Sequence, residues 1–441
     1  MIFLIYSHTT KVGFSNNPGL PEHSDYFTLK EFRPVLEKLG KVMIVENPET
    51  EVDPIYMECK ARGEQCVFLS FSPPHKTALD LACPTISVLT WEFDTIPNEI
   101  WDNDPRNDWR YCFGKLGWAI TQSEFAVKAI KAAMGDDFPV VSISAPVWDR
   151  FEQVRQTIPH MTTLAKTRLM TNGVIFDSRT TSLSVYAPNW SASSPEAPQT
   201  SQETKEMMVA GEIPIDIEGV VYTTTFCPYD GRKNWFDMFF SFCWAFRDVE
   251  DATLIMELTH RDNSLAMETF KKCLYQLTPF KCRIIAIQGP LSDHNYEQLA
   301  AVTTYCLNTS HGEGQCLPLM EFMSDGIPAV DPRHTSMGDY VDERVAFLDN
   351  ASAQPTCWPQ DNVRMAYRTK CYRIDCESMV NALLESYRVA KENPERYVSM
   401  SRAANARLKQ HCSRAIVQEK LRDFISVDRR IFRSFAASTE I

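Results

Sequence analysis

At 441 residues, the chain exceeds the length at which one hydrophobic core keeps growing, so we expect two domains with a cleft between them. The formal net charge of -12, from 45 basic and 57 acidic side chains, argues against a dedicated nucleic-acid-binding protein, because neutralising phosphates requires a basic face. Hydrophobic residues make up 44% of the chain and charged residues 23%, which is typical of globular proteins and excludes large-scale disorder.

The first residues, MIFLIYSHTT, form an apolar run too short for a secretory signal and lack a preceding basic residue, so they predict a β-strand. The most aromatic stretch, WFDMFFSFCWAF, is shorter than the roughly 20 apolar residues of a membrane span, and no transmembrane segment is expected. The 14 cysteines include no C-x-x-C pair, so neither a disulfide framework nor a structural metal is expected. Reduced thiols in a cytoplasmic protein fit this pattern, and peripheral contact with the inner face of a membrane stays open.

Residues 1–150 alternate short apolar runs with helical patterns, which is typical of strand–helix–strand units and a parallel sheet. Ser123 and Gly135 predict the two ends of one of these helices, as its N-cap and C-terminal residue. This part of the chain is expected to be one domain. The predicted strands are residues 1–7, 41–47, 66–72, 85–93, 117–123 and 139–146.

The alternation breaks at residues 151–215, which predict a linker with an insertion. Within it, GVIFDSRTTSLSVYAP (173–188) predicts a β-hairpin, and the Ser/Pro/Glu-rich stretch 189–206 predicts an exposed, mobile loop. A second open α/β domain follows over residues 216–400, and residues 401–441 are expected to be helices that return toward the first domain. The predicted strands of the second domain are 219–226, 252–258, 283–289, 303–309 and 327–331, with a helix from about Asn234.

The stretch SHGEGQCLPLMEFMSDGIPAV (310–330) places two glutamates on either side of a glycine-rich turn. Pro318 suits the first helical position and Gly326 the position after a helix, so the stretch predicts strand, turn, short helix and strand. The N-terminus of that helix offers N–H groups and a positive dipole end to an anion such as phosphate. Because Glu313 and Glu321 would repel a phosphate, we expect them to accept hydrogen bonds from sugar hydroxyls of the same ligand. That combination describes a nucleotide-sugar.

The same stretch resembles the E-x7-E signature of family 4 retaining glycosyltransferases of the GT-B fold, whose usual form is close to EGFGLPLLEAMACGxPVV. Segments 120–130, 223–242 and 285–299 also resemble this family, in the expected order along the chain. The resemblance implies an α/β protein with two Rossmann-like domains facing across a cleft. It places the acceptor on the side of residues 1–150 and the nucleotide-sugar on residues 216–400.

The resemblance also implies roles for single residues. Glu313 would lie beside the donor sugar, Glu321 would bind the ribose, and Lys233 would neutralise the leaving diphosphate. The family commonly has an arginine five positions before this lysine, where this chain has Pro228, so Arg232 is expected to stand in for it. The other residues placed at the donor are Gly314, Gln315, Cys316 and Leu317, through their N–H groups, and Gly289 and Pro290 in the base-binding segment.

Residues on the acceptor side follow less specific signals. His8, His75, Trp91 and Glu92 come at or after the ends of predicted strands, where open α/β sheets bind ligands. A capped loop histidine explains His75 equally well. The DND triplet at residues 102–104 formally matches a metal-binding D-x-D, but its polar, Pro-containing surroundings favour a solvated turn, and no metal is assigned.

The expected activity is metal-independent transfer of a sugar, with retention of configuration, from a UDP- or GDP-sugar to a hydroxyl of a growing glycan or glycolipid. No cofactor beyond the donor is required, a role in polysaccharide biosynthesis fits, and no oligomeric state is specified. Two alternatives stay open: another enzyme of this fold, such as a nucleotide-sugar epimerase or a phosphorylase, and a non-catalytic nucleotide-sugar-binding protein.

Overall fold

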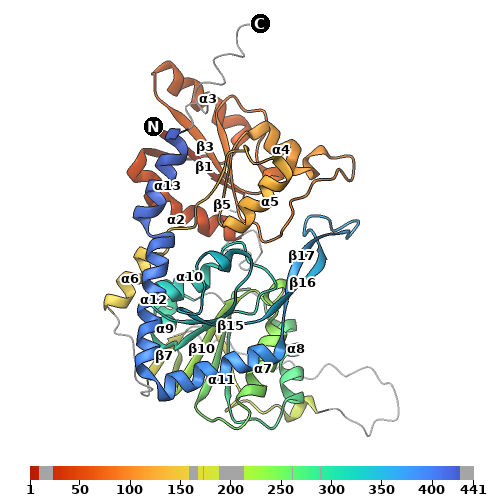
Figure 1. The fold of residues 1–441 in the computed structure, drawn as a ribbon, viewed down its shortest axis with the longest axis vertical. Coiled ribbons are helices and arrows are strands. Elements are labelled where there is room, and N and C mark those ends of the chain that lie inside the picture. The colour runs from red at the N-terminus through yellow and green to blue at the C-terminus, as the bar shows by residue number, and fades with distance from the viewer. Residues whose placement is uncertain are drawn as a thin grey trace.

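The computed structural model describes residues 1–8, 23–157, 167–171, 173–187, 213–260, 262–288 and 291–427. They form two α/β domains, each built on a twisted sheet flanked by helices (Figure 1). The first sheet is wholly parallel, in the order β2-β1-β3-β4-β5-β6. Its strands are β1 (Ile2–Ser7), β2 (Lys41–Ile44), β3 (Cys66–Phe71), β4 (Thr85–Leu89), β5 (Ala119–Thr121) and β6 (Val140–Ser142). Its helices are α2 (His23–Leu39), α3 (Pro48–Ala61), α4 (Trp109–Leu116) and α5 (Glu124–Met134).

Local sequence signals explain these elements well. Every residue of β3 is buried, as expected for a parallel strand covered on both faces. The hydroxyl of Ser123 accepts a hydrogen bond from the Ala126 N–H at 3.2 Å and caps α5, and Gly135 follows the helix with φ of +98°. Both predicted ends of this helix are confirmed.

The second sheet has the order β15-β14-β13-β10-β11-β12-β8. The first six strands are parallel, and the strand order reverses direction between β10 and β13, so this is a doubly wound sheet with its switch point there. Its strands are β8 (Val174–Asp177), β10 (Val220–Phe226), β11 (Ala252–Leu258), β12 (Arg283–Gln288), β13 (Tyr305–Leu307), β14 (Ala329–Pro332) and β15 (Ala346–Asp349). Its helices are α7 (Trp235–Ala245), α8 (Ser264–Gln276), α9 (Asp293–Val302), α10 (Leu317–Ser324) and α11 (Cys376–Glu392).

The segment 173–188 differs from its prediction. It does not pair with itself as a β-hairpin: β8 pairs antiparallel with β12 and closes the edge of the second sheet. A tertiary contact accompanies this pairing: Asp177 forms a largely buried ion pair with Arg283 of β12 at 2.6 Å. A separate antiparallel pair joins β7 (Thr167–Thr171) to β9 (Ile213–Ile217). The loop predicted at 189–206 lies outside the described residues.

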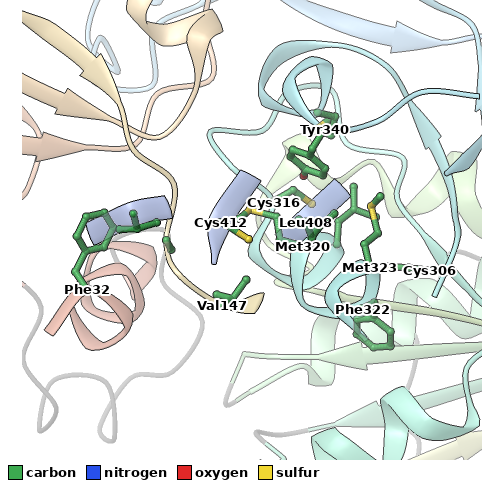
Figure 2. Packing of buried hydrophobic residues seen from close by; sticks show 14 of the residues in the cluster. Phe32, Val147, Cys306, Cys316, Met320, Phe322, Met323, Tyr340, Leu408 and Cys412 are labelled. Atoms are coloured by element: carbon green, nitrogen blue, oxygen red, sulfur yellow. The ribbon is translucent and has the colours of Figure 1, made fainter. Parts of the chain in front are cut away.

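Three helices connect the domains. α6 (Trp148–Thr157) leads out of the first domain, α12 (Pro394–Cys412) packs against α6, α10 and α11, and α13 (Arg414–Val427) returns to α2. Figure 2 shows Cys316 and Met320 beside Leu408 and Cys412, in an apolar cluster that continues into the first domain through Phe32. Val417, Leu421 and Ile425 of α13 are buried in the same cluster, so the last helix of the described chain packs on α2 within a core that the two domains share.

One element was not foreseen from the sequence. Strands β16 (Ala351–Cys357) and β17 (Tyr367–Ile374) form a two-stranded antiparallel sheet of their own. Residues 351–374, here called the arm, rise from the second domain toward the first (Figure 1).

Candidate active site

The candidate site lies at the switch point of the second sheet, where open α/β sheets bind ligands. The loop after β10 carries Lys233, and the loop after β13 carries Glu313. Asp230 caps a single 3₁₀ turn by accepting a hydrogen bond from the Arg232 N–H at 3.1 Å, and Asn234, with φ of +47°, begins α7. Strand ends and local caps thus bring together residues that are far apart in sequence.

Glu313 is held from several sides. Its carboxylate receives the Lys233 ammonium at 2.6 Å and a hydrogen bond from the Ser310 hydroxyl. Its backbone N–H donates to the Thr335 hydroxyl at 3.0 Å, and its carbonyl accepts from the Ser336 N–H at 3.3 Å. The carboxylate is therefore a fixed acceptor, 5% exposed as a residue.

The environment keeps Lys233 charged. Burial by itself lowers the pKa of this lysine, but Glu313 raises it, and the net result is a pKa above the ordinary value. A half-buried ammonium with one carboxylate partner is available to a second anion, such as a diphosphate.

A second ion pair crosses from one domain to the other. Glu92, three residues after β4, receives Arg232 at 2.5 Å, and the same guanidinium contacts Asp230 at 2.8 Å. Burial raises the pKa of Glu92, and Arg232 opposes this shift. Arg232 also donates to the carbonyl of Gly312 at 3.3 Å. Arg232 therefore joins the loop after β4 to the loop after β10 and, through Gly312, to residues 308–316. The loop after β4 and residues 308–316 are here called the acceptor-side and donor-side loops, after their predicted roles.

The glycine turn of that donor-side loop also touches the first domain. A Cβ on Gly314 would lie 2.0 Å from the Thr90 methyl, so this position requires glycine. The Gln315 amide donates to the Thr28 hydroxyl at 2.9 Å and accepts from the Ala145 N–H at 3.2 Å. Next to it, Cys316 is buried, with φ of +55°, at the start of α10, followed by Leu317.

Glu321 lies on α10, eight residues after Glu313, and has its own set of partners. The Tyr296 hydroxyl donates to its carboxylate at 2.9 Å. Burial raises its pKa to about 7, which the Tyr296 hydrogen bond and Arg150 oppose. Glu257 of β11 is another nearby acid, and burial raises its pKa to about 8. Glu321 and Glu257 are therefore two carboxyl groups whose pKa values lie near neutral pH.

The four residues predicted on the acceptor side have different environments in the structure. Glu92 joins the site, whereas Trp91 is buried beneath it, with its indole N–H donating to the Thr95 carbonyl at 3.0 Å. His75 stacks on Trp109, whose ring lies 4.5 Å from that of Trp91. His8 is exposed at the end of β1. Gly289 and Pro290 lie outside the described residues.

The space at the site is small. A cavity of about 20 Å³ is bordered by Lys233, Glu313, Asn308 and Thr225, which is room for about one water molecule. Binding sites for ligands of drug size occupy roughly 300–1,000 Å³. This cavity by itself is too small for a nucleotide-sugar.

No metal site emerges in the part of the chain that the structure describes, where no three His, Cys, Asp or Glu side chains are grouped to hold an ion. In the DND triplet, Asp104 accepts from the Arg106 N–H at 2.9 Å and caps a turn. Among the described helices, none is both long and apolar enough to cross a membrane.

Several residues of the site escaped the sequence reasoning. Ser310 and Thr335 hold Glu313, and Tyr296 and Arg150 act on Glu321. Of these contacts, only the one between Ser310 and Glu313 had a local signal in the sequence. Ser310 lies three residues before Glu313, a spacing at which side chains meet in tight turns.

Comparison with known proteins gives no match to a family model and none to a curated protein sequence. Solved structures do match over nearly the whole chain. Sucrose-phosphate synthase from Thermosynechococcus elongatus aligns with a TM-score of 0.55 at 11% identity, covering 98% of this chain and 99% of that one. The chain has the GT-B fold.

Two further structures share the GT-B fold with this chain. A glycosyltransferase from Rickettsia africae has a TM-score of 0.54 at 8% identity, with 98% of each chain covered. HepE from Anabaena, in complex with UDP, has a TM-score of 0.52 at 10% identity, covering 97% of this chain and 99% of that one. Other matches are to longer chains, of which this chain spans 55% and 54%. The prediction of two Rossmann-like domains in the GT-B arrangement is confirmed.

Proposed function

We propose that this protein is a retaining glycosyltransferase of the family 4 type, which moves a sugar from a nucleotide diphosphate donor to a hydroxyl of a glycan or glycolipid. The observation that carries the proposal is the pair of cations at the switch point, Lys233 and Arg232, each held by a carboxylate. The GT-B fold and the UDP complex of the HepE structure support UDP-sugars as the first donors to test.

In the proposed reaction, the loops separate and the donor enters between them. Lys233 and Arg232 then turn from Glu313 and Glu92 to the diphosphate, Glu313 accepts hydrogen bonds from the sugar hydroxyls, and Glu321 accepts them from the ribose. Preorganised charges of this kind stabilise the developing negative charge of a leaving group.

The bond from the anomeric carbon to the diphosphate oxygen breaks as the acceptor oxygen attacks from the same face, which retains the configuration. The acceptor proton passes to the departing phosphate oxygen. Glu92, whose pKa is raised by burial, lies at the domain boundary where it can hold the acceptor hydroxyl. The two cations supply the charge that a metal ion supplies elsewhere, so the proposed reaction needs no metal. We place it in the cytoplasm, in polysaccharide biosynthesis, with the acceptor at the inner face of a membrane.

The test is a screen of UDP- and GDP-sugars in which released nucleotide is measured with and without glycan acceptors. We expect turnover with at least one donor, and its loss in Glu313→Gln, with Glu385→Gln as a control that removes a surface carboxylate from the same domain. Binding of UDP without turnover of any donor would favour the non-catalytic alternative. An anomerically inverted product would reject the retaining mechanism.

A further inference from the structure

The arm makes a polar contact with the first domain that involves several charged groups. Both oxygens of Glu99 are engaged, one by Arg364 at 2.8 Å and the other by Arg368 at 2.6 Å. The Asp94 carboxylate accepts from the Thr369 hydroxyl at 2.9 Å and from the Lys370 N–H at 3.0 Å. Two carboxylates of the loop after β4 are thus bound by groups of the arm, from Arg364 to Lys370.

An aromatic contact accompanies the polar one. Trp358 is 1% exposed although it belongs to a two-stranded arm, because it lies in the apolar cluster of the first domain that contains Trp91 and Phe93. Its ring stacks on Trp101 at 6.3 Å, and its N–H donates to the Thr95 hydroxyl at 3.1 Å. Trp358 is therefore inserted into the first domain.

The base of the arm is bound to the donor-side loop. The Tyr372 N–H donates to the His311 carbonyl at 2.8 Å, and the Tyr372 carbonyl lies 2.8 Å from Nδ1 of His311. The His311 N–H in turn donates to the carbonyl of Arg232 at 2.7 Å. Tyr372 also stacks on His334, with ring centroids 4.6 Å apart.

Each attachment is close to one member of the Arg232–Glu92 pair: Asp94 and Thr95 follow Glu92 in the chain, and the His311 N–H donates to the Arg232 carbonyl. The loop that carries Glu92 is held at Asp94, Thr95 and Glu99, and the loop that carries Glu313 is held at His311. The arm is therefore a further connection between the acceptor-side and donor-side loops, in addition to the Arg232–Glu92 pair.

We propose that the arm sets the spacing between these loops, and that Glu99 and Trp358 are positioning residues for the Glu92–Arg232 pair. The proposal rests on the proposed function for its catalytic consequence, although the mechanical connection itself does not. Loss of the Glu99 contacts is expected to loosen both ends of the arm, including the donor-side loop, which Glu99 does not touch.

The experiment compares Glu99→Gln and Glu99→Lys with the control Glu385→Gln. Glu385 pairs with Arg396 at 2.8 Å on the surface of the second domain, so the control removes one carboxylate of a surface ion pair away from the arm. Hydrogen–deuterium exchange is followed in peptides covering residues 90–101, 308–316 and 367–374. We expect exchange to rise by about tenfold in all three segments in Glu99→Gln, as for the loss of two partly exposed ion pairs, more in Glu99→Lys, and not at all in the control.

Faster exchange in 367–374 with no change in 308–316 would overturn the proposal, because the arm would then be a surface contact without effect on the donor-side loop. With a donor that turns over, kcat should fall in the Glu99 variants while donor KM changes little, and equal losses in both would likewise overturn a positioning role. If the wild-type protein turns over no donor, the proposed function fails and the exchange data still decide whether the arm connects the loops.

Discussion

Glu321 gives a prediction in which the direction of a pH effect is fixed by the structure. Burial raises its pKa from the ordinary 4.5 to about 7, so the carboxylate that would accept hydrogen bonds from a ribose is the main form only above that pH. Between pH 6 and pH 8 the ionised fraction rises from about 10% to about 90%. If UDP binds the ionised form, its association constant should rise about tenfold over this range, which corresponds to about 1.4 kcal/mol. Glu321→Gln removes the titrating group and should remove this part of the pH dependence.

The assay is titration calorimetry with UDP at pH 6, 7 and 8 on the wild type, Glu321→Gln and Tyr296→Phe. A phosphate group titrates in the same range, so only the difference between proteins at each pH reports on Glu321. Tyr296→Phe deletes a hydrogen bond that lowers the pKa of Glu321, so its midpoint should move to higher pH. Arg150 lowers and Glu31 raises the pKa of Glu321, and both residues are present in the wild type and in Tyr296→Phe. An identical pH slope in the wild type and Glu321→Gln would refute the assignment of Glu321 to the ribose.

Three further predictions use the turnover assay. Lys233→Ala should lower kcat by about 10²–10³ with a smaller change in donor KM, and Arg232→Ala should show a smaller loss; near-normal kcat in a folded Lys233→Ala protein would reject its role at the diphosphate. Thr335→Val keeps the β-branched shape but deletes the hydroxyl that accepts the Glu313 N–H, so kcat/KM should fall about 10- to 100-fold and recover in Thr335→Ser, while Thr303→Val, a buried hydroxyl elsewhere, should leave it unchanged. Activity should survive EDTA, and loss that added Mn²⁺ or Mg²⁺ restores would show that a metal is required after all.

Much of the fold follows from local patterns in the sequence. The apolar run CVFLSF predicts a buried strand because parallel strands are covered on both faces, and Ser123 predicts a helix start because capping is a contact between near neighbours. The hairpin predicted at 173–188 was wrong because the pairing of this segment depends on a distant part of the chain. β8 pairs with β12, and its Asp177 binds Arg283, over 100 residues later, which no local pattern contains.

The arm was missed for a related physical reason. Its first strand, ASAQPTC, is polar and contains a proline, which is a poor signal for a strand. What stabilises it is distant: Trp358 is buried by the first domain, and the partners of Arg364 and Arg368 are more than 260 residues away.

In the site, too, the features with local sequence signals were predicted and those that depend on distant residues were not. The spacing of Glu313 and Glu321 around a glycine turn predicted the strand, turn and helix that carry them, because each step has local chemistry. The Arg232–Glu92 pair joins two domains and has no counterpart in either segment alone. Thr335 has φ of +47°, a conformation that β-branched residues avoid, so only the surrounding structure places its hydroxyl against Glu313.

The return of α13 to the first domain has a consequence for how the protein is made. Val417, Leu421 and Ile425 of α13 are buried in the same cluster as Leu29 and Phe32 of α2. Ribosomes add about 5–20 residues per second, so roughly 15–55 s separate the emergence of the first 150 residues from that of the helix that covers them. During that interval the nascent chain exposes an apolar face on α2, to which a chaperone can bind. The domain that is synthesised first is therefore completed last.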